Sequence, residues 1–130
     1  MARMAIGIAA VALFLAGCVN SRPPEVEHID VPTRGAPAGG VIACMDALAG
    51  GTIVDDPRWG TALAQDDGIR MQVVWPAGYA ARRIDGVLEL LDESGHVVAR
   101  AGDRVLVAGG MGAGQAWFAC GPPEPAVNVP

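Results

Sequence analysis

The sequence predicts a mostly β chain: a small closed or partly open β-barrel with a short N-terminal helix, preceded by a cleaved signal peptide and a disordered tether. Short apolar and β-branched runs, broken by Gly, Pro and Asp, fill the central part. No helical stretch separates these runs, as parallel βαβ units would require. A chain of 130 residues has room for one domain. We expect a signal peptide at 1–17, a tether at 18–40, the domain at 41–122 and a flexible tail at 123–130.

The N-terminus has the pattern of an export signal. Residues 4–17 contain no charged side chain and follow Arg3. A membrane-spanning helix needs roughly 20 apolar residues, and polar residues (Asn20, Ser21, Arg22) follow too early for that. The length and the flanks are typical of the apolar region of a signal peptide.

The end of this region, Leu15-Ala16-Gly17-Cys18, resembles the lipobox of bacterial lipoprotein precursors. The resemblance implies that the Cys18 thiol is lipidated, that signal peptidase II cuts before Cys18, and that fatty acids such as palmitate anchor the mature chain. Two acyl chains hold stably, since each buried CH₂ contributes about 0.8 kcal/mol. We expect an extracytoplasmic protein bound to the membrane through the lipid on Cys18, at the outer face of the cell membrane or in the outer membrane of a two-membrane cell. The alternatives are an ordinary signal peptide and an uncleaved anchor.

The charge balance restricts the partners. The chain has no lysine, and its nine Arg face fourteen Asp and Glu for a net charge of −5. Loss of Arg3 with the leader makes the mature chain more acidic still. Nucleic-acid binding needs a cationic face, so we expect no nucleic-acid partner. Attraction to anionic lipid head groups is equally disfavoured.

The flanks of the domain have the composition of flexible chain. Residues 19–40 read VNSRPPEVEHIDVPTRGAPAGG, with several Pro and Gly, mixed charges and no apolar periodicity. Such a segment cannot bury enough apolar surface to offset its ordering entropy, so we expect a disordered tether. His28 lies in it and is expected to be solvated rather than a metal ligand. Residues 123–130 have the same character.

Within the domain, Ile42, Met45 and Leu48 have helical spacing ahead of Gly50-Gly51, which favours a short helix, with a strand as the alternative. Strands are expected at 52–54, 61–64, 69–75, 87–91, 96–100, 104–108 and 115–120. This spacing favours a five- to six-stranded barrel of OB type, whose closure removes exposed strand edges. The stretch from Val74 onward (VVWPAGYAARR, VLELLDESGHVVARAGDRVLVAGG) also resembles a recurrent domain of uncharacterised bacterial lipoproteins. That resemblance implies no activity.

Two cysteines remain once Cys18 is lipidated. Cys44 and Cys120 lie near the two ends of the domain, in a compartment where disulfides persist. We predict a disulfide between them, which contributes about 4 kcal/mol by chain entropy. A redox pair or a metal site is the alternative, but the CxxC spacing and a nearby His are missing.

Other motifs have plain structural interpretations. The run GGMGAG (109–114) is not followed by the Gly-Lys-Ser/Thr of a phosphate-binding loop, and we expect a flexible hairpin loop. The pairs Asp55-Asp56 and Asp66-Asp67 are expected at turns rather than in a calcium site. His96 is expected to face outward and not to act as a catalytic base. Surface ion pairs are expected for the arginines Arg82, Arg83 and Arg104.

The aromatic residues offer the one indication of a binding site. Trp117 is expected in the core near the predicted disulfide, whereas Trp59, Trp75 and Tyr79 lie at expected strand ends and loops. Exposed there, they could bind sugar rings or a partner protein. The alternative is that they plug the mouth of the barrel.

Three functions follow, in decreasing order of support. The first is a non-enzymatic binding module for a cell-envelope glycan or a protein partner. The second is a structural accessory lipoprotein with no small ligand. An enzyme comes third, because no nucleophile, metal set or paired acid can be assembled from the sequence. We expect no cofactor and no metal.

Overall fold

The structure is a computed structural model and describes residues 17, 22–35 and 44–127. Strands dominate the described residues, together with one short 3₁₀ turn. They are β1 (Val26–Ile29), β2 (Ala47–Asp56), β3 (Gly60–Ala64), β4 (Arg70–Val74), β5 (Ala80–Ile84), β6 (Val87–Leu91), β7 (Val97–Arg100), β8 (Arg104–Met111), η1 (Ala113–Gln115), β9 (Trp117–Ala119) and β10 (Glu124–Pro125).

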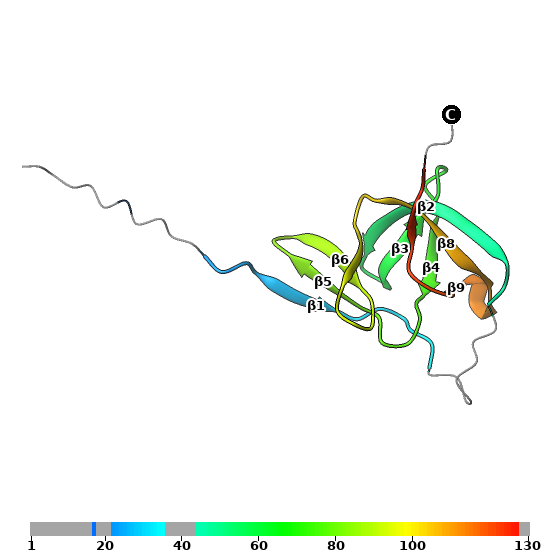
Figure 1. The fold of residues 1–130 in the computed structure, drawn as a ribbon. Helices are drawn as coiled ribbons and strands as arrows, with labels where there is room; N and C mark the ends of the chain where they lie inside the picture. The colour runs from blue at the N-terminus through cyan, green and yellow to red at the C-terminus, as the bar shows by residue number, and fades with distance from the viewer. Residues whose placement is uncertain (1–16, 18–21, 36–43, 128–130) are drawn as a thin grey trace, which may run out of the picture.

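Five of the strands close into a barrel. Their order around it is β8-β2-β3-β4-β9, and pairing of β9 with β8 completes the ring (Figure 1). Neighbours are antiparallel except β4 and β9, which run parallel with Val73 opposite Trp117. The predicted β-barrel is therefore confirmed.

A second, smaller sheet beside the barrel combines the strands between β4 and β8 with β1 from the N-terminal segment. Its antiparallel order is β1-β5-β6-β7 (Figure 1). Backbone hydrogen bonds connect the two sheets at one turn: Gly102 N–H donates to Ile53 at 2.8 Å, and Ile53 N–H donates to Asp103 at 2.9 Å. Of the strands expected from the sequence, all are present within a few residues, while β1, β5 and β10 were not anticipated.

One continuous apolar core lies between the sheets. Ile53, Leu63 and Val107 come from the barrel, Leu88 and Leu90 come from the smaller sheet, and all five are fully buried in the same cluster. Alternating strand positions supply these side chains, as the period of two requires. Trp117 is also buried here, which confirms its predicted place in the core.

Arginine–carboxylate pairs join the smaller sheet to the barrel. Arg83 of β5 donates two hydrogen bonds to the Asp55 carboxylate of β2, at 2.8 and 2.9 Å, and also pairs with Glu27 of β1. Such bidentate geometry is the strong form of this pairing. Arg82 pairs with Glu89 at 3.0 Å, so the predicted ion pairs are confirmed. Asp55 belongs to a strand, which corrects the expected turn.

The Asp56 and Glu89 carboxylates are buried and each faces two guanidinium groups. Asp56 accepts from Arg58 and from Arg70, at 3.3 and 3.2 Å. Burial alone raises the pKa of Asp56, but these hydrogen bonds outweigh it and lower the pKa to about 2. Burial likewise raises the pKa of Glu89, and its bonds from Arg82 and Arg100 bring the pKa below its usual value. Both carboxylates therefore stay ionised inside the fold.

The short helix predicted before Gly50 is wrong. Ala47 and Leu48 belong to β2, and Ala47–Gly51 pairs with Val105–Gly109 of β8. The helical spacing of Met45 and Leu48 is not used, because both side chains are exposed. Pairing along a whole strand outweighs a local pattern that buries nothing.

The disordered tether predicted at 18–40 is wrong for residues 22–35. Val26–Ile29 form β1 along β5. Further on, Trp75 N–H donates to Pro32 at 2.9 Å, and Arg34 N–H donates to Trp75 at 2.8 Å. A neighbouring strand edge thus orders a segment whose composition alone could not.

The flexible tail predicted at 123–130 is wrong in its first part. β10 pairs with β8, and Ala126 N–H donates to Arg104 at 3.0 Å. The predicted signal peptide and Cys18 lie outside the described residues, apart from Gly17. In the described part of the chain, no helix has the length and apolar character needed to cross a membrane.

Candidate functional site

The aromatic platform predicted from the sequence does not form around Trp75. This side chain is 0% exposed, and its indole N–H donates to the Thr61 hydroxyl at 2.8 Å. The segment at Thr33 forms a parallel backbone bridge to Trp75. The prediction that Trp75 is an exposed partner-binding residue is wrong, because its side chain is fully buried.

Tyr79 and Trp59 are half-buried and lie in different surroundings. The Tyr79 ring stacks on Trp75, with centroids 6.2 Å apart and planes 6° apart. Burial and the nearby carboxylates of Asp92 and Glu93 raise the pKa of Tyr79. The Arg58 guanidinium covers the Trp59 ring at 4.0 Å from its centroid. Among the described residues, this aromatic stacking does not include Trp59.

The predicted disulfide is confirmed. Cys44 and Cys120 are bonded, with Cα atoms 5.6 Å apart, across a sequence separation of 76. That spacing is in the usual range for a disulfide. The bond ties the chain just before β2 to the chain just after β9.

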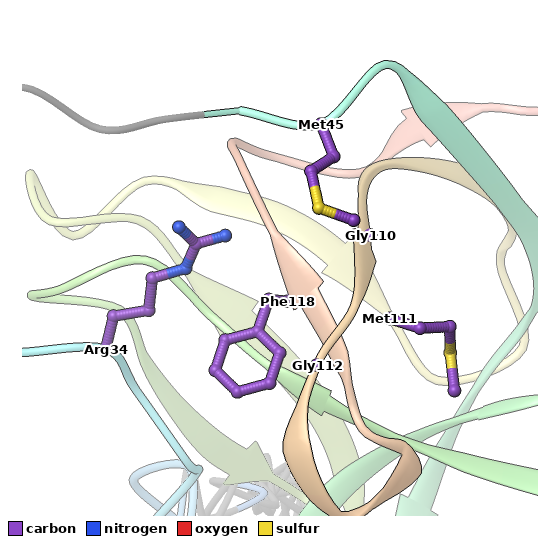
Figure 2. Close-up of a pocket in the computed structure, with 6 residues that line it drawn as sticks. All are labelled: Arg34, Met45, Gly110, Met111, Gly112 and Phe118. Atoms are coloured by element: carbon purple, nitrogen blue, oxygen red, sulfur yellow. The ribbon is translucent and has the colours of Figure 1, made fainter.

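A cavity of about 210 Å³ opens at this end of the barrel. The lining residues are Arg34, Met45, Gly110, Met111, Gly112 and Phe118. Figure 2 shows the Arg34 guanidinium and the Met45 side chain pointing into the space beside the Phe118 ring, while the Met111 side chain points away from it. Met45 follows Cys44 and Phe118 precedes Cys120 by two residues, so the disulfide fastens both walls of the cavity.

Arg34 is the charged group of the cavity. Its Nη2 donates to the Ala119 carbonyl at 2.8 Å, and its guanidinium lies 5.7 Å from the centroid of the Phe118 ring. Its Nε is buried and has no hydrogen-bond partner. Within the described residues, no carboxylate lies within 4.0 Å of this guanidinium.

The glycines of GGMGAG shape the wall of the cavity. Gly109 and Gly110 are part of β8 and buried, so the expected flexible loop is wrong for these residues. A Cβ at Gly110 would lie 2.3 Å from the end of the Met45 side chain. A Cβ at Gly112 would lie 2.0 Å from the Phe118 ring. Glycine at both positions leaves room for the two apolar side chains.

Two further cavities, of about 210 and 260 Å³, are lined in part by Ala126 and by Pro125, respectively. Both are lined by an arginine, Arg104. That arginine has a carboxylate partner, since its Nη2 lies 3.5 Å from Asp66. The three cavities have similar volumes. The cavity at the disulfide differs from the other two because its arginine, Arg34, has no carboxylate partner among the described residues.

No protein-family model, no curated protein and no solved structure matches this chain. The resemblance of the segment from Val74 onward to a lipoprotein domain therefore stays a prediction.

The remaining predicted features are placed as follows. His28 and His96 are both exposed, and the His96 ring lies 3.7 Å from Asp92. In the ranges 22–35 and 44–127, no group of three or more His, Cys, Asp or Glu is placed to hold a metal ion.

Sequence reasoning missed Arg34, Met45 and Phe118 as site residues. The composition of residues 18–40 predicts a tether that includes Arg34, and the spacing of Met45 and Leu48 predicts a helix. One signal was present: Met45 and Phe118 lie next to the two cysteines that were predicted to pair. The predicted disulfide implies that Met45 and Phe118 lie close together. It gives no information on the position of Arg34.

Proposed function

We propose that this chain is a lipid-anchored extracytoplasmic binding module, non-enzymatic, which binds a cell-envelope component or a protein partner at the cavity beside the Cys44–Cys120 disulfide. The anchor rests on the lipobox at 15–18. The binding role rests on one observation: among the described residues Arg34 has no carboxylate partner and lies over Phe118 in a cavity, whereas Arg82 and Arg83 of the smaller sheet are paired with carboxylates.

The strand order supports the finer proposal that the barrel is OB-like. Numbered along the chain, its strands β2, β3, β4, β8 and β9 are first to fifth. Around the barrel they follow the order one-two-three-five-four, and the third and fifth are parallel. This is the connectivity of OB barrels, which bind oligonucleotides and oligosaccharides on one face and its loops. Between its third and fourth strands, this barrel carries β5, β6 and β7.

The ordered N-terminal segment limits how far the folded domain can lie from the membrane. Only residues 19–25 separate Cys18 from β1, and a chain of that length spans roughly 25 Å when fully extended. In Figure 1, η1 and β9 lie on the side of the molecule away from the start of β1. The cavity next to β9 would thus face away from the anchored end, toward components of the envelope.

The anchor is tested by replacing its cysteine. We expect Cys18→Ala to abolish incorporation of a clickable fatty acid and to leave the precursor uncut by signal peptidase II. Globomycin should make the wild-type precursor accumulate. Undiminished fatty-acid label on the variant would overturn the assignment.

The binding role is tested by photo-crosslinking in cells. A photoactivatable residue at Met45 of the lipidated protein should trap a defined envelope component, because this exposed side chain reaches into the cavity. The matched control is Ile69, an equally exposed apolar residue that does not line the cavity. Equal products from both positions would contradict a binding site here.

Burial of Trp75 favours a second candidate, a structural accessory lipoprotein with no small ligand. Loss of the aromatic platform removes the binding surface expected from the sequence. This candidate predicts no specific product from Met45, so the same crosslinking experiment separates the two.

A further inference from the structure

The Arg34 guanidinium has donors to spare. Nη2 is used by Ala119, whereas the buried Nε has no acceptor. An unsatisfied buried donor costs free energy, and a charged one more so, until an acceptor is supplied. The guanidinium therefore retains donor capacity and positive charge for an acceptor, preferably an anion, in the cavity.

The surroundings of this cation are apolar. The Phe118 ring and the Met45 side chain line the cavity with it (Figure 2). Neither supplies a strong acceptor, and methionine adapts its shape to irregular apolar groups. An inorganic anion would satisfy Arg34 but leave these two side chains without a partner.

The volume sets the size of the group that fits. A cavity of about 150 Å³ accommodates benzene, so about 210 Å³ accommodates one apolar side chain with a carboxylate attached. Carboxylates and phosphates both match the paired donors of a guanidinium, and the carboxylate, as the smaller of the two, leaves more of this volume to an apolar group.

We propose that the cavity binds a carboxylate carried on an apolar group about as large as one amino-acid side chain, with Arg34 binding the carboxylate and Phe118 and Met45 packing on the apolar part. The inference rests on the proposed binding function and specifies its ligand. Two sources share this chemistry, a peptide that ends in an apolar residue and a free apolar acid.

The test uses the mature chain from residue 18, with Cys18→Ser so that no detergent is required, and follows backbone amide signals by NMR. The probes are N-acetyl-leucine, hexanoate, the primary amides of both, and acetate. We expect the two apolar acids to shift signals of Gly110, Gly112 and Phe118, and to bind about tenfold more tightly than their amides or acetate. Preference for N-acetyl-leucine would identify a peptide terminus as the source, and preference for hexanoate a free acid.

Charge variants separate recognition from folding. Arg34→Gln should weaken both acids at least tenfold. Because Arg34 also contacts Ala119, a second pair is needed at exposed Met45. Met45→Glu should weaken the acids several-fold, since its carboxylate competes for Arg34, whereas Met45→Lys, of similar length, should bind them as well or better.

Each outcome has a defined meaning. Equal affinity for acids and amides, or equal behaviour of Met45→Glu and Met45→Lys, would overturn the carboxylate assignment. Such a result, together with a specific crosslink from Met45 in cells, would leave the binding function standing with a different ligand. Without that crosslink, both proposals would fail.

Discussion

The arginines of the smaller sheet and the arginine at the disulfide end lie in opposite environments. In the smaller sheet, Arg82 and Arg100 share the buried Glu89, and Arg83 joins Asp55 of the barrel to Glu27 of β1. At the other site Arg34 lies over Phe118, and no carboxylate of the described residues pairs with it.

This difference separates arginines that stabilise the fold from an arginine whose charge is available to bind a ligand. A guanidinium between two carboxylates is satisfied by the fold and holds strands together. The chain has a surplus of carboxylates, yet the other residues that line the cavity of Arg34 are glycine, methionine and phenylalanine. Replacement of a paired arginine in the smaller sheet should therefore lower the stability of the protein, whereas replacement of Arg34 should lower the affinity for a ligand in the cavity.

The largest expected effect comes from removal of the disulfide, which holds together the chain segments that carry Met45 and Phe118. The double variant Cys44→Ser/Cys120→Ser should lower the free energy of unfolding by about 4 kcal/mol, because the unfolded chain regains the entropy of a long loop. Urea denaturation of the mature chain measures this. Wild-type protein with dithiothreitol should show a similar loss.

Ligand binding provides a second measurement on that double variant. Met45 would no longer be held beside Phe118, so affinity for the apolar acids should fall even where the fold persists. Two thiols that react with maleimide in the unreduced native protein would contradict the bond itself. A stability change below about 1 kcal/mol would show that other contacts fix these chain ends.

Asp56 gives a smaller, pH-dependent effect. Asp56→Asn keeps the shape and should lower the free energy of unfolding by about 1–2 kcal/mol at pH 7, allowing for solvent screening of Arg58 and Arg70. The folded pKa of about 2 lies below the usual 3.8, so folding favours the ionised form. The wild-type advantage is therefore complete above about pH 5 and lost as the pH falls from about 4 to about 2.

Thermal unfolding of both proteins across this pH range measures that difference. The control is Asp66→Asn, which removes an exposed carboxylate paired only loosely with Arg104. It should change stability by less than about 0.5 kcal/mol at any pH. A constant gap between wild type and Asp56→Asn down to pH 2 would contradict the ionised, hydrogen-bonded state of Asp56.

Most strands of the two sheets could be predicted because their local pattern agrees with their final environment. Residues 87–91 and 104–108 alternate or bury apolar side chains between clear turn residues. The strands β1 and β5 could not, since VEHI and AARRI are polar and are stabilised by partners distant in sequence, such as Arg83 with Asp55 and Glu27. Periodicity contains no information about such pairs.

The same limit applies to the site. Pairing of Cys44 with Cys120 could be predicted from compartment and count, because only two cysteines remained. Trp75 is fully buried and its backbone pairs with the segment around Thr33, and its position at a strand end reveals neither. Arg34 enters the cavity at the end of that same segment. When a segment has the composition of a tether, a binding residue within it can be recognised only after the strand pairing of that segment is known.

The smallest expected effect is on the stability of an Arg34 variant. Arg34→Met keeps the apolar stem, loses the bond to Ala119, and removes the unpaired buried Nε. The lost hydrogen bond is worth about 1 kcal/mol and the relieved donor offsets it, so the free energy of unfolding should change by less than about 1 kcal/mol. Arg82→Met is the matched variant in the smaller sheet. It leaves the buried Glu89 with one partner in place of two and should cost more. If Arg34→Met proved the more destabilising of the two in urea denaturation, Arg34 would be a structural link between the N-terminal segment and β9.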